Sequence, residues 1–142
     1  MREEHQTPDG AEAAFYAAFA ATDLKAMDRV WQNGDETVCI HPGGALLLGK
    51  TAVMQSWAEI LGGSAPPRID YRLLSRIQAP DLEIHLVEES IRAGADPNAQ
   101  PNRVISTNVY ARGTSGWRMR VHHASLPIMA RRGTPGSGHQ LH

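Results

Sequence analysis

The segment Trp117-Arg-Met-Arg-Val-His-His-Ala-Ser-Leu-Pro127 is the stretch from which the fold can be worked out. Trp117, Met119 and Val121 alternate with polar residues, and this period of two predicts a β-strand with one buried and one solvated face. If the alternation continues, His123 and Ser125 lie on the same face as Trp117. The pattern therefore predicts an imidazole that faces the interior of the protein.

Composition limits the class of protein. The chain has 142 residues, of which 42% are hydrophobic and 20% charged, which is typical of one soluble globular domain. A formal net charge of -1 argues against nucleic-acid binding. The sequence contains no apolar run of about twenty residues and no signal-peptide core, so we expect no membrane span and a cytoplasmic location. Cys39 is the single cysteine, which excludes an internal disulfide and is expected to be buried in a strand.

The first half of the chain is predicted to be mainly helical. Thr7-Pro8-Asp9 is typical of a helix start, with Asp9 and Glu12 spaced for a capping box. A second, shorter helix is predicted from Thr22-Asp23 to Asn33-Gly34, and a third between Gly49 and Gly62. A strand over 36–41 and a short strand over 45–48 separate the second and third helices.

The second half is predicted to form four long antiparallel strands. They follow the Pro66-Pro67 breaker and are joined by turns. In the strand that begins at Leu82, Glu88 follows an apolar row and is assigned to the inner face, whereas a shift of one residue would put Glu89 there. A long antiparallel sheet curls, and the three helices are available to cover its concave face. We therefore expect an α+β cone with a pocket: an N-terminal arm over 1–8, one domain over 9–127, and a flexible tail over 128–142.

This order of elements resembles the SnoaL-like domain family of the nuclear transport factor 2-like superfamily. The matching segments are Ala26-Met27 with Trp31, Cys39-Ile40-His41-Pro42-Gly43-Gly44, Gly49-Lys50-Thr51-Ala52-Val53 with Trp57, Thr107-Asn108-Val109-Tyr110, and Gly116-Trp117-Arg118-Met119 leading to His122-His123-Ala124-Ser125. The resemblance implies the cystatin-like cone fold of the ketosteroid isomerases, and a superfamily that includes enzymes as well as binding and assembly domains. The last strand also resembles that of the calmodulin-dependent kinase association domain, an oligomerisation module.

Glu88 and His123 are the candidate catalytic residues. A carboxylate among apolar neighbours should have a raised pKa, and with a nearby imidazole it would form a general acid–base pair. The other residues predicted to line the pocket are Tyr16, Trp31, His41, Trp57, Asn108, Tyr110 and Trp117. Several of these residues have a purely structural alternative. The tryptophans and Tyr16 could be core residues, His41 could only hydrogen-bond the backbone of the turn that follows it, and His123 could be a buried, hydrogen-bonded histidine.

Two functions remain open from the sequence. The first is a pocket for a small apolar carbonyl or hydroxyl compound, with acid–base chemistry of the isomerase, cyclase or hydrolase type. The second is a non-catalytic ligand-binding or homodimerisation module. Under either function we expect a homodimer through the outer sheet face, which would carry Arg118, Arg120, His122, Glu89, Val87, Val109 and Ile105. No cofactor is expected. A metal site formed by His41, Glu88 and His123 is chemically conceivable but lacks the close spacing of known motifs, so none is predicted.

Overall fold

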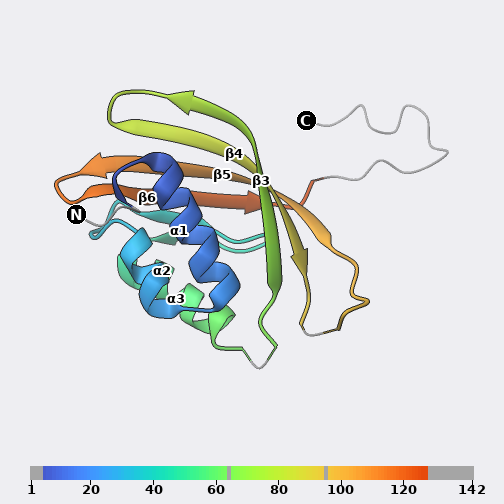
Figure 1. The fold of residues 1–142 in the computed structure, drawn as a ribbon. Coiled ribbons are helices and arrows are strands. Elements are labelled where there is room, and N and C mark those ends of the chain that lie inside the picture. The colour runs from blue at the N-terminus through green and yellow to red at the C-terminus, as the bar shows by residue number, and fades with distance from the viewer. Residues whose placement is uncertain (1–4, 64, 95, 128–142) are drawn as a thin grey trace.

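The computed structural model describes residues 5–63, 65–94 and 96–127. The three helices and six strands are, in chain order, α1 (Pro8–Ala21), α2 (Leu24–Val30), β1 (Val38–Ile40), β2 (Leu47–Leu48), α3 (Lys50–Leu61), β3 (Arg68–Gln78), β4 (Leu82–Arg92), β5 (Asn102–Gly113) and β6 (Gly116–Ser125). Figure 1 shows the helices gathered on one face of the sheet. The predicted α+β fold is confirmed. The predicted tail over 128–142 and residues 1–4 of the predicted N-terminal arm lie outside the described residues.

The sheet has the strand order β2-β1-β6-β5-β4-β3. β1 runs parallel to β6, whereas the other neighbouring pairs are antiparallel, so the sheet is mixed. An irregularity in β3 between Leu73 and Ser75 accompanies the bend of that strand in Figure 1. The short β1–β2 pair thus continues the long curved β3–β6 meander beyond β6, and the helices cover one face of the sheet.

α1 begins differently from the predicted capping box. The Thr7 hydroxyl accepts a hydrogen bond from the Gly10 amide at 2.9 Å, and Pro8 occupies the first helical turn. The Glu12 side chain is therefore not needed at the cap, and it faces the sheet. Apolar residues of α1 and α3 fill the space against the sheet, where Phe15 and Trp57 are fully buried with ring centroids 5.5 Å apart. Burying a side chain of this size typically stabilises a fold by about 2–3 kcal/mol.

A β-bulge in β6 changes which histidine is buried. Val121 pairs with Val109 and Met119 pairs with Tyr110, so Arg120 is an extra residue that has no counterpart on β5. Because one inserted residue reverses the alternation, His122 is buried at 2% exposure and His123 is exposed. The prediction that His123 faces the interior is therefore wrong.

The alternation of β4 is as predicted, but its inner face is the opposite one. Val87 and Glu89 are buried at 0% and 1% exposure, whereas Leu86 is 37% exposed. Glu88 lies on the outer face, where it pairs with Arg72 at 2.8 Å and with Arg103. The assignment of Glu88 to the interior is thus wrong, and Glu89 occupies the inner position.

Candidate functional site

Three polar side chains of α1 contact the inner face of the sheet. Asp9, Glu12 and Tyr16 follow one another at helical spacing, so they lie on one face of an otherwise alanine-rich helix. Asp9 meets Arg76 of β3, Glu12 meets His85 of β4, and Tyr16 reaches the centre of the sheet. This stripe forms two polar groups, which are described in turn.

The first group is a directional chain of hydrogen bonds that we call the Tyr16–Glu89 site, consisting of Tyr16, Glu89, Asn108 and His122. The Tyr16 hydroxyl donates to Glu89 Oε2 at 2.6 Å and accepts from Asn108 Nδ2 at 2.9 Å. Asn108 Oδ1 lies 2.6 Å from His122 Nδ1, which must be the protonated nitrogen because an amide oxygen only accepts. The chain therefore ends on a carboxylate oxygen that accepts from Tyr16.

Burial sets the protonation states in this site. It raises the pKa of the Glu89 carboxyl above its ordinary value, although the hydrogen bond from Tyr16 opposes the shift. Burial also raises the pKa of Tyr16, so its hydroxyl keeps its proton. Burial and two neighbouring histidines lower the pKa of His122 to about 3, so its imidazole is neutral at ordinary pH. Glu89 is thus the member of this chain whose pKa moves towards neutral pH.

The Tyr16–Glu89 site is closed in this structure. Tyr16, Glu89, Asn108 and His122 are each at most 2% exposed, which leaves almost no room for water against them. The ring of Tyr71 from β3 stacks on Tyr16, with centroids 4.0 Å apart and planes 13° from parallel, and is itself 41% exposed. Tyr71 therefore stands between this site and solvent.

His41 extends the polar surroundings towards α3. Its Nε2 lies 2.9 Å from Ser56 Oγ, which donates its own hydrogen to the Val53 carbonyl at 2.6 Å, so His41 is the donor. The His41 ring lies 4.9 Å from that of Trp57 and 6.4 Å from that of His122. The His41 side chain thus hydrogen-bonds to α3. The alternative from the sequence, a hydrogen bond to the backbone of the following turn, is not what this side chain forms. Cys39 beside it is buried, and burial raises the pKa of its thiol to about 12, which makes it a poor nucleophile.

The second group lies at the amino-terminal end of α1, and we call it the His85 cluster: Asp9, Glu12, Arg76, Glu83, His85 and Tyr110. His85 is fully buried, with Nδ1 2.8 Å from Glu12 Oε1 and Nε2 2.6 Å from Glu83 Oε2. The Tyr110 hydroxyl donates to Glu12 at 3.3 Å. Burial lowers the pKa of His85, but the hydrogen bonds to Glu12 and Glu83 outweigh it and the pKa is raised.

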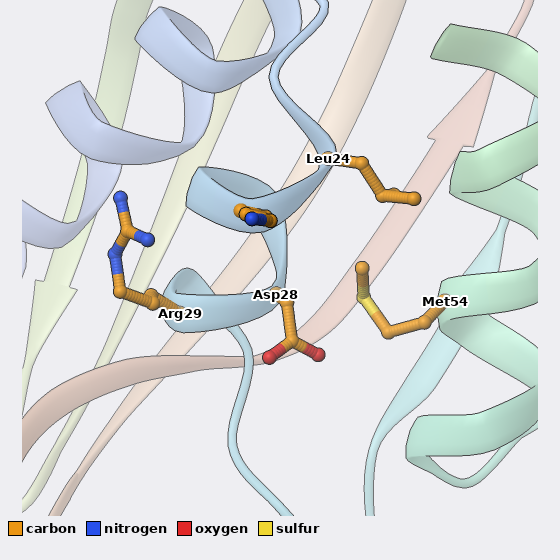
Figure 2. A pocket seen from close by; sticks show the side chains of 5 residues that line it. Leu24, Asp28, Arg29 and Met54 are labelled. Atoms are coloured by element: carbon orange, nitrogen blue, oxygen red, sulfur yellow. The ribbon is translucent and has the colours of Figure 1, made fainter. Parts of the chain in front are cut away.

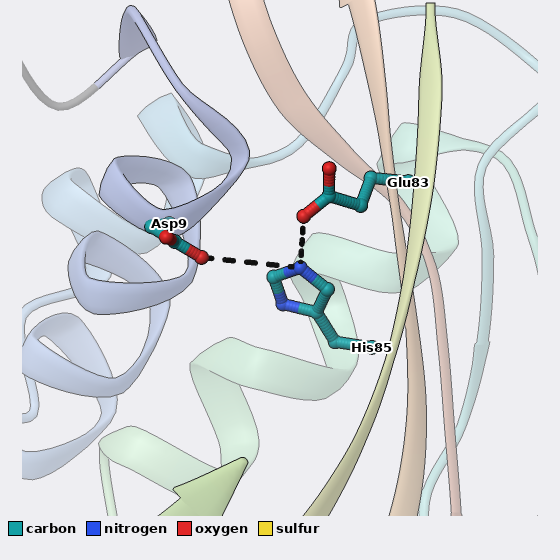
Figure 3. A group of neighbouring side chains, drawn as sticks. All are labelled: Asp9, Glu83 and His85. Carbon is teal, nitrogen blue, oxygen red and sulfur yellow. Dashed lines mark hydrogen bonds and ion pairs between the residues drawn. The ribbon is translucent and has the colours of Figure 1, made fainter. Parts of the chain in front are cut away.

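Figure 3 shows the carboxylates of Asp9 and Glu83 directed at His85 Nε2. The donor atoms of these three residues lie within 4.8 Å of one another, close enough for one cation to touch all of them. The guanidinium of Arg76 already supplies such a cation, because it is 3.0 Å from Asp9 Oδ1 and 3.2 Å from Glu83 Oε2. We therefore interpret the cluster as a network of ion pairs built from the chain itself.

The structure brings some of the predicted pocket residues together but not others. Tyr16 and Asn108 belong to one hydrogen-bonded chain, and Tyr110 lies in the His85 cluster. Trp57 packs on His122 with ring centroids 6.0 Å apart, whereas the backbone of Trp31 pairs with Met119. Trp117 lies at the β5–β6 turn beneath Arg112 and away from the Tyr16–Glu89 site.

Four inner-face residues were not predicted from the sequence: Glu12, Glu83, His85 and His122. Glu88 was predicted at the inner position of β4, with Glu89 as the alternative. One sequence pattern could have identified three residues of β4. Glu83, His85 and Glu89 lie on one face of the strand, and α1 carries polar residues at a spacing that matches them. Glu88 and His123 do not line a common pocket, since both lie on the outer face of the sheet.

A surface cavity of about 450 Å³ lies between α2 and α3, outside the cone (Figure 2). Leu24 and Met54 form its apolar walls, and Asp28 lies at its edge. A second cavity of about 360 Å³ lies at the β5–β6 turn, beside Arg112 and Trp117. Of the residues predicted to line the pocket, these two cavities include only Trp117.

The fold and the buried polar chain on its concave face define a cone-shaped α+β domain of the nuclear transport factor 2-like type. Residues 11–129 match the SnoaL-like domain family, and the chain belongs to that family. Within the residues that the structure describes, no helix is both long and apolar enough to cross a bilayer.

Three known proteins that are similar to this chain carry different functional descriptions. A Thiobacillus denitrificans protein, proposed to be a calcium/calmodulin-dependent protein kinase type II association domain, is 39% identical over 87% of this chain and 97% of its own, with a TM-score of 0.80. A Streptomyces avermitilis protein of the NTF2-like family, proposed to be a dehydratase, is 26% identical over 84% of this chain and 93% of its own, with a TM-score of 0.73. F-box protein SKIP8 of Arabidopsis thaliana is 27% identical over 122 residues, which cover 81% of this chain and 47% of that relative.

Proposed function

We propose that this chain binds a small neutral molecule at the Tyr16–Glu89 site, with Tyr71 as the side chain that moves to admit it. The observation that supports the proposal is the hydrogen bond of 2.6 Å between Tyr16 and a Glu89 carboxyl that is 1% exposed. A buried carboxyl lowers stability when it is charged, and such groups are concentrated at functional sites.

The surroundings favour a ligand with a carbonyl or hydroxyl oxygen. Phe15, Trp57 and Val87 supply apolar walls, and a charged Glu89 would repel an anion. The Ser106 hydroxyl, which is also fully buried, lies near enough to lower the pKa of Glu89 yet makes no hydrogen bond of normal geometry. An oxygen atom on a ligand would give Ser106 the partner that a buried hydroxyl requires.

Acid–base chemistry is the reaction type that these groups suit. Glu89 would exchange a proton with the ligand. The Tyr16 hydroxyl, which remains protonated, would turn its one hydrogen from Glu89 to a ligand oxygen on which negative charge develops. The Asn108–His122 pair would hold Tyr16 in place for this role.

A fragment screen on matched variants tests the proposal. Neutral carbonyl and hydroxyl compounds are ranked by the rise in melting temperature that they cause, first in wild type and then in Glu89→Gln. Glu88→Gln is the control, because it makes the same chemical change one residue away on the outer face. We expect the stabilisation to be lost in Glu89→Gln and kept in Glu88→Gln. Equal stabilisation of all three proteins would contradict the proposed site.

We also propose that the chain forms a homodimer through the outer face of the sheet. One apolar side chain from each strand lies in a single row across that face, because each is paired with the next. In order from β3 to β2, the row consists of Ile77, Ile84, Val109, Val121, Val38 and Leu48. Ile77 and Leu48 at its two ends are each 61% exposed. A continuous apolar row on an uncovered sheet is a feature of interaction surfaces, and a second copy would present the same row.

This row replaces part of the predicted interface. Val109 and Ile105 lie on the outer face as expected, whereas Val87, Glu89 and His122 are buried inside. Arg118 is hydrogen-bonded to the backbone carbonyl of Arg29, and Arg120 pairs with Glu36 at 3.1 Å.

A further inference from the structure

The His85 cluster is joined through α1 to the Tyr16–Glu89 site, because Glu12 and Tyr16 are one helical turn apart. We propose that the cluster is a proton-operated latch that sets how firmly α1 closes over the Tyr16–Glu89 site. The proposal rests on the proposed function of that site, whose regulation it describes.

The latch follows from the hydrogen-bonding capacity of imidazole. Both nitrogens of His85 lie within hydrogen-bond distance of a carboxylate oxygen, Nδ1 at 2.8 Å from Glu12 and Nε2 at 2.6 Å from Glu83. A neutral imidazole has one N–H and satisfies one of these contacts, whereas the imidazolium satisfies both. When the second proton leaves, a nitrogen lone pair faces a carboxylate, and the contact becomes repulsive.

The charges around His85 make the loss of its second proton destabilising. Asp9 and Glu12 face His85 from α1, Glu83 from its own strand, Arg76 from β3, and the neutral Tyr110 from β5. The carboxylates outnumber the cations even when His85 is charged. Arg76 offsets only part of this excess, because its side chain is 34% exposed and therefore screened.

The direction of the effect follows from the raised pKa of His85. A group whose pKa is higher in the folded state stabilises the fold fully below its unfolded pKa and loses that contribution as the pH rises through the folded pKa. The latch is therefore closed in mildly acidic solution and weakens on the alkaline side. Weakening it releases the first turns of α1, the helix that carries Tyr16.

Hydrogen–deuterium exchange of α1 measures the latch without a ligand. Wild type is compared at pH values from about 5.5 to 9, with exchange corrected for its intrinsic pH dependence, in the presence of a chelator. We expect protection of α1 to fall by about tenfold for each unit by which folding raises the pKa of His85. α3 serves as the internal reference, because the hydrogen-bond and ion-pair partners of His85 in the described part of the chain lie on α1 and β4. Protection of α1 that does not vary with pH, or that falls together with that of α3, would overturn the proposal.

Glu83→Gln isolates the contact that switches. Its amide can donate to the lone pair of neutral His85, so α1 should keep its protection across the pH range. The control is Glu88→Gln, which removes a carboxylate from the same strand on the opposite face and should behave as wild type. A Glu83→Gln protein that keeps the wild-type pH dependence would refute the latch.

Glu89→Gln separates this proposal from the proposed function. This variant lacks the carboxyl of the Tyr16–Glu89 site but leaves the His85 cluster intact. The latch predicts that α1 protection in Glu89→Gln still falls more than that of α3 as the pH rises, whether or not any fragment binds. Loss of this difference between α1 and α3 would count against the latch alone.

Discussion

The phenol ring of Tyr71 lies flat on that of Tyr16, and the two residues come from the exposed edge strand β3 and the buried face of α1. Replacing Tyr71 with alanine should uncover Tyr16 at a cost in unfolding free energy of about 1 kcal/mol, the usual value of an aromatic pair. Hydroxyl-radical footprinting read by mass spectrometry should show Tyr16 oxidised several times faster than in wild type.

The matched control is Ile77→Ala on the same strand. Ile77 is 61% exposed on the outer face, so its loss should leave the oxidation of Tyr16 unchanged. If Tyr16 is equally protected in Tyr71→Ala and wild type, Tyr71 does not close the site.

Glu89 should lower stability at neutral pH. Because its folded pKa is raised, Glu89 stabilises the fold below its unfolded pKa, and this contribution disappears as the pH rises through the folded pKa. At neutral pH the unfolding free energy of Glu89→Gln should therefore exceed that of wild type by roughly 1.4 kcal/mol for each unit by which folding raises the pKa of Glu89. Near about pH 4 the two proteins should have similar unfolding free energies. Urea unfolding at several pH values measures this difference.

Glu88 should show the opposite pH dependence. Hydrogen bonds from Arg103 and Arg72 lower its pKa, so its contribution is present at neutral pH and is lost as the pH falls through the folded pKa. The same urea series on Glu88→Gln tests this. Two neighbouring glutamates with the same sign of effect would mean that the two faces of β4 are wrongly assigned.

His122 should remain neutral well below the ordinary pKa of histidine. With a folded pKa of about 3, it should cause a loss of stability as the pH falls from about 6.5 towards that value, because the unfolded chain takes up a proton that the folded chain refuses. In an NMR titration the His122 ring signals should stay constant down to about pH 4, with hydrogen on Nδ1. A mid-range titration would exclude the buried neutral form.

Val109→Arg should convert the proposed dimer to a monomer. Val109 lies near the middle of the apolar row, and a buried unpaired charge costs several kcal/mol at such a contact. Sedimentation velocity should show a single smaller species with unchanged circular dichroism. Leu24→Arg is the control, because Leu24 is 39% exposed at the cavity between α2 and α3 rather than on the sheet. A monomeric wild type would refute this proposal at once.

Most of the fold could be predicted from periodicity and turn residues. The helix breaks near Asp23 and Gly49 and the long strands after Pro66-Pro67 are local properties of the sequence, and the structure reproduces them. What could not be predicted was which face of the sheet is the inner one. Ile84 and Leu86 make the outer face of β4 more apolar than the inner face, so hydrophobicity alone gives the wrong assignment.

The candidate site depended on partners from distant parts of the chain. Glu89 and His85 can be buried because α1, 73 residues earlier in each case, supplies Tyr16 and Glu12. A strand by itself gives no indication of these partners. The sequence did place Tyr16 in the first helix and Asn108 in the fifth strand, both of which belong to the site.

The extra residue at Arg120 gives β6 an unusual property. Trp117 and His122 are separated by an odd number of positions, yet both are buried on the same side of the sheet. Deleting Arg120 would remove the bulge and leave His122 paired with Asn108, so the inward direction of His122 depends on its pairing with β5 and not on its distance from Trp117. Counting alternate residues from Trp117 therefore identifies the wrong interior histidine, and an alignment with relatives that lack the extra residue needs a gap at this point to compare the right residues.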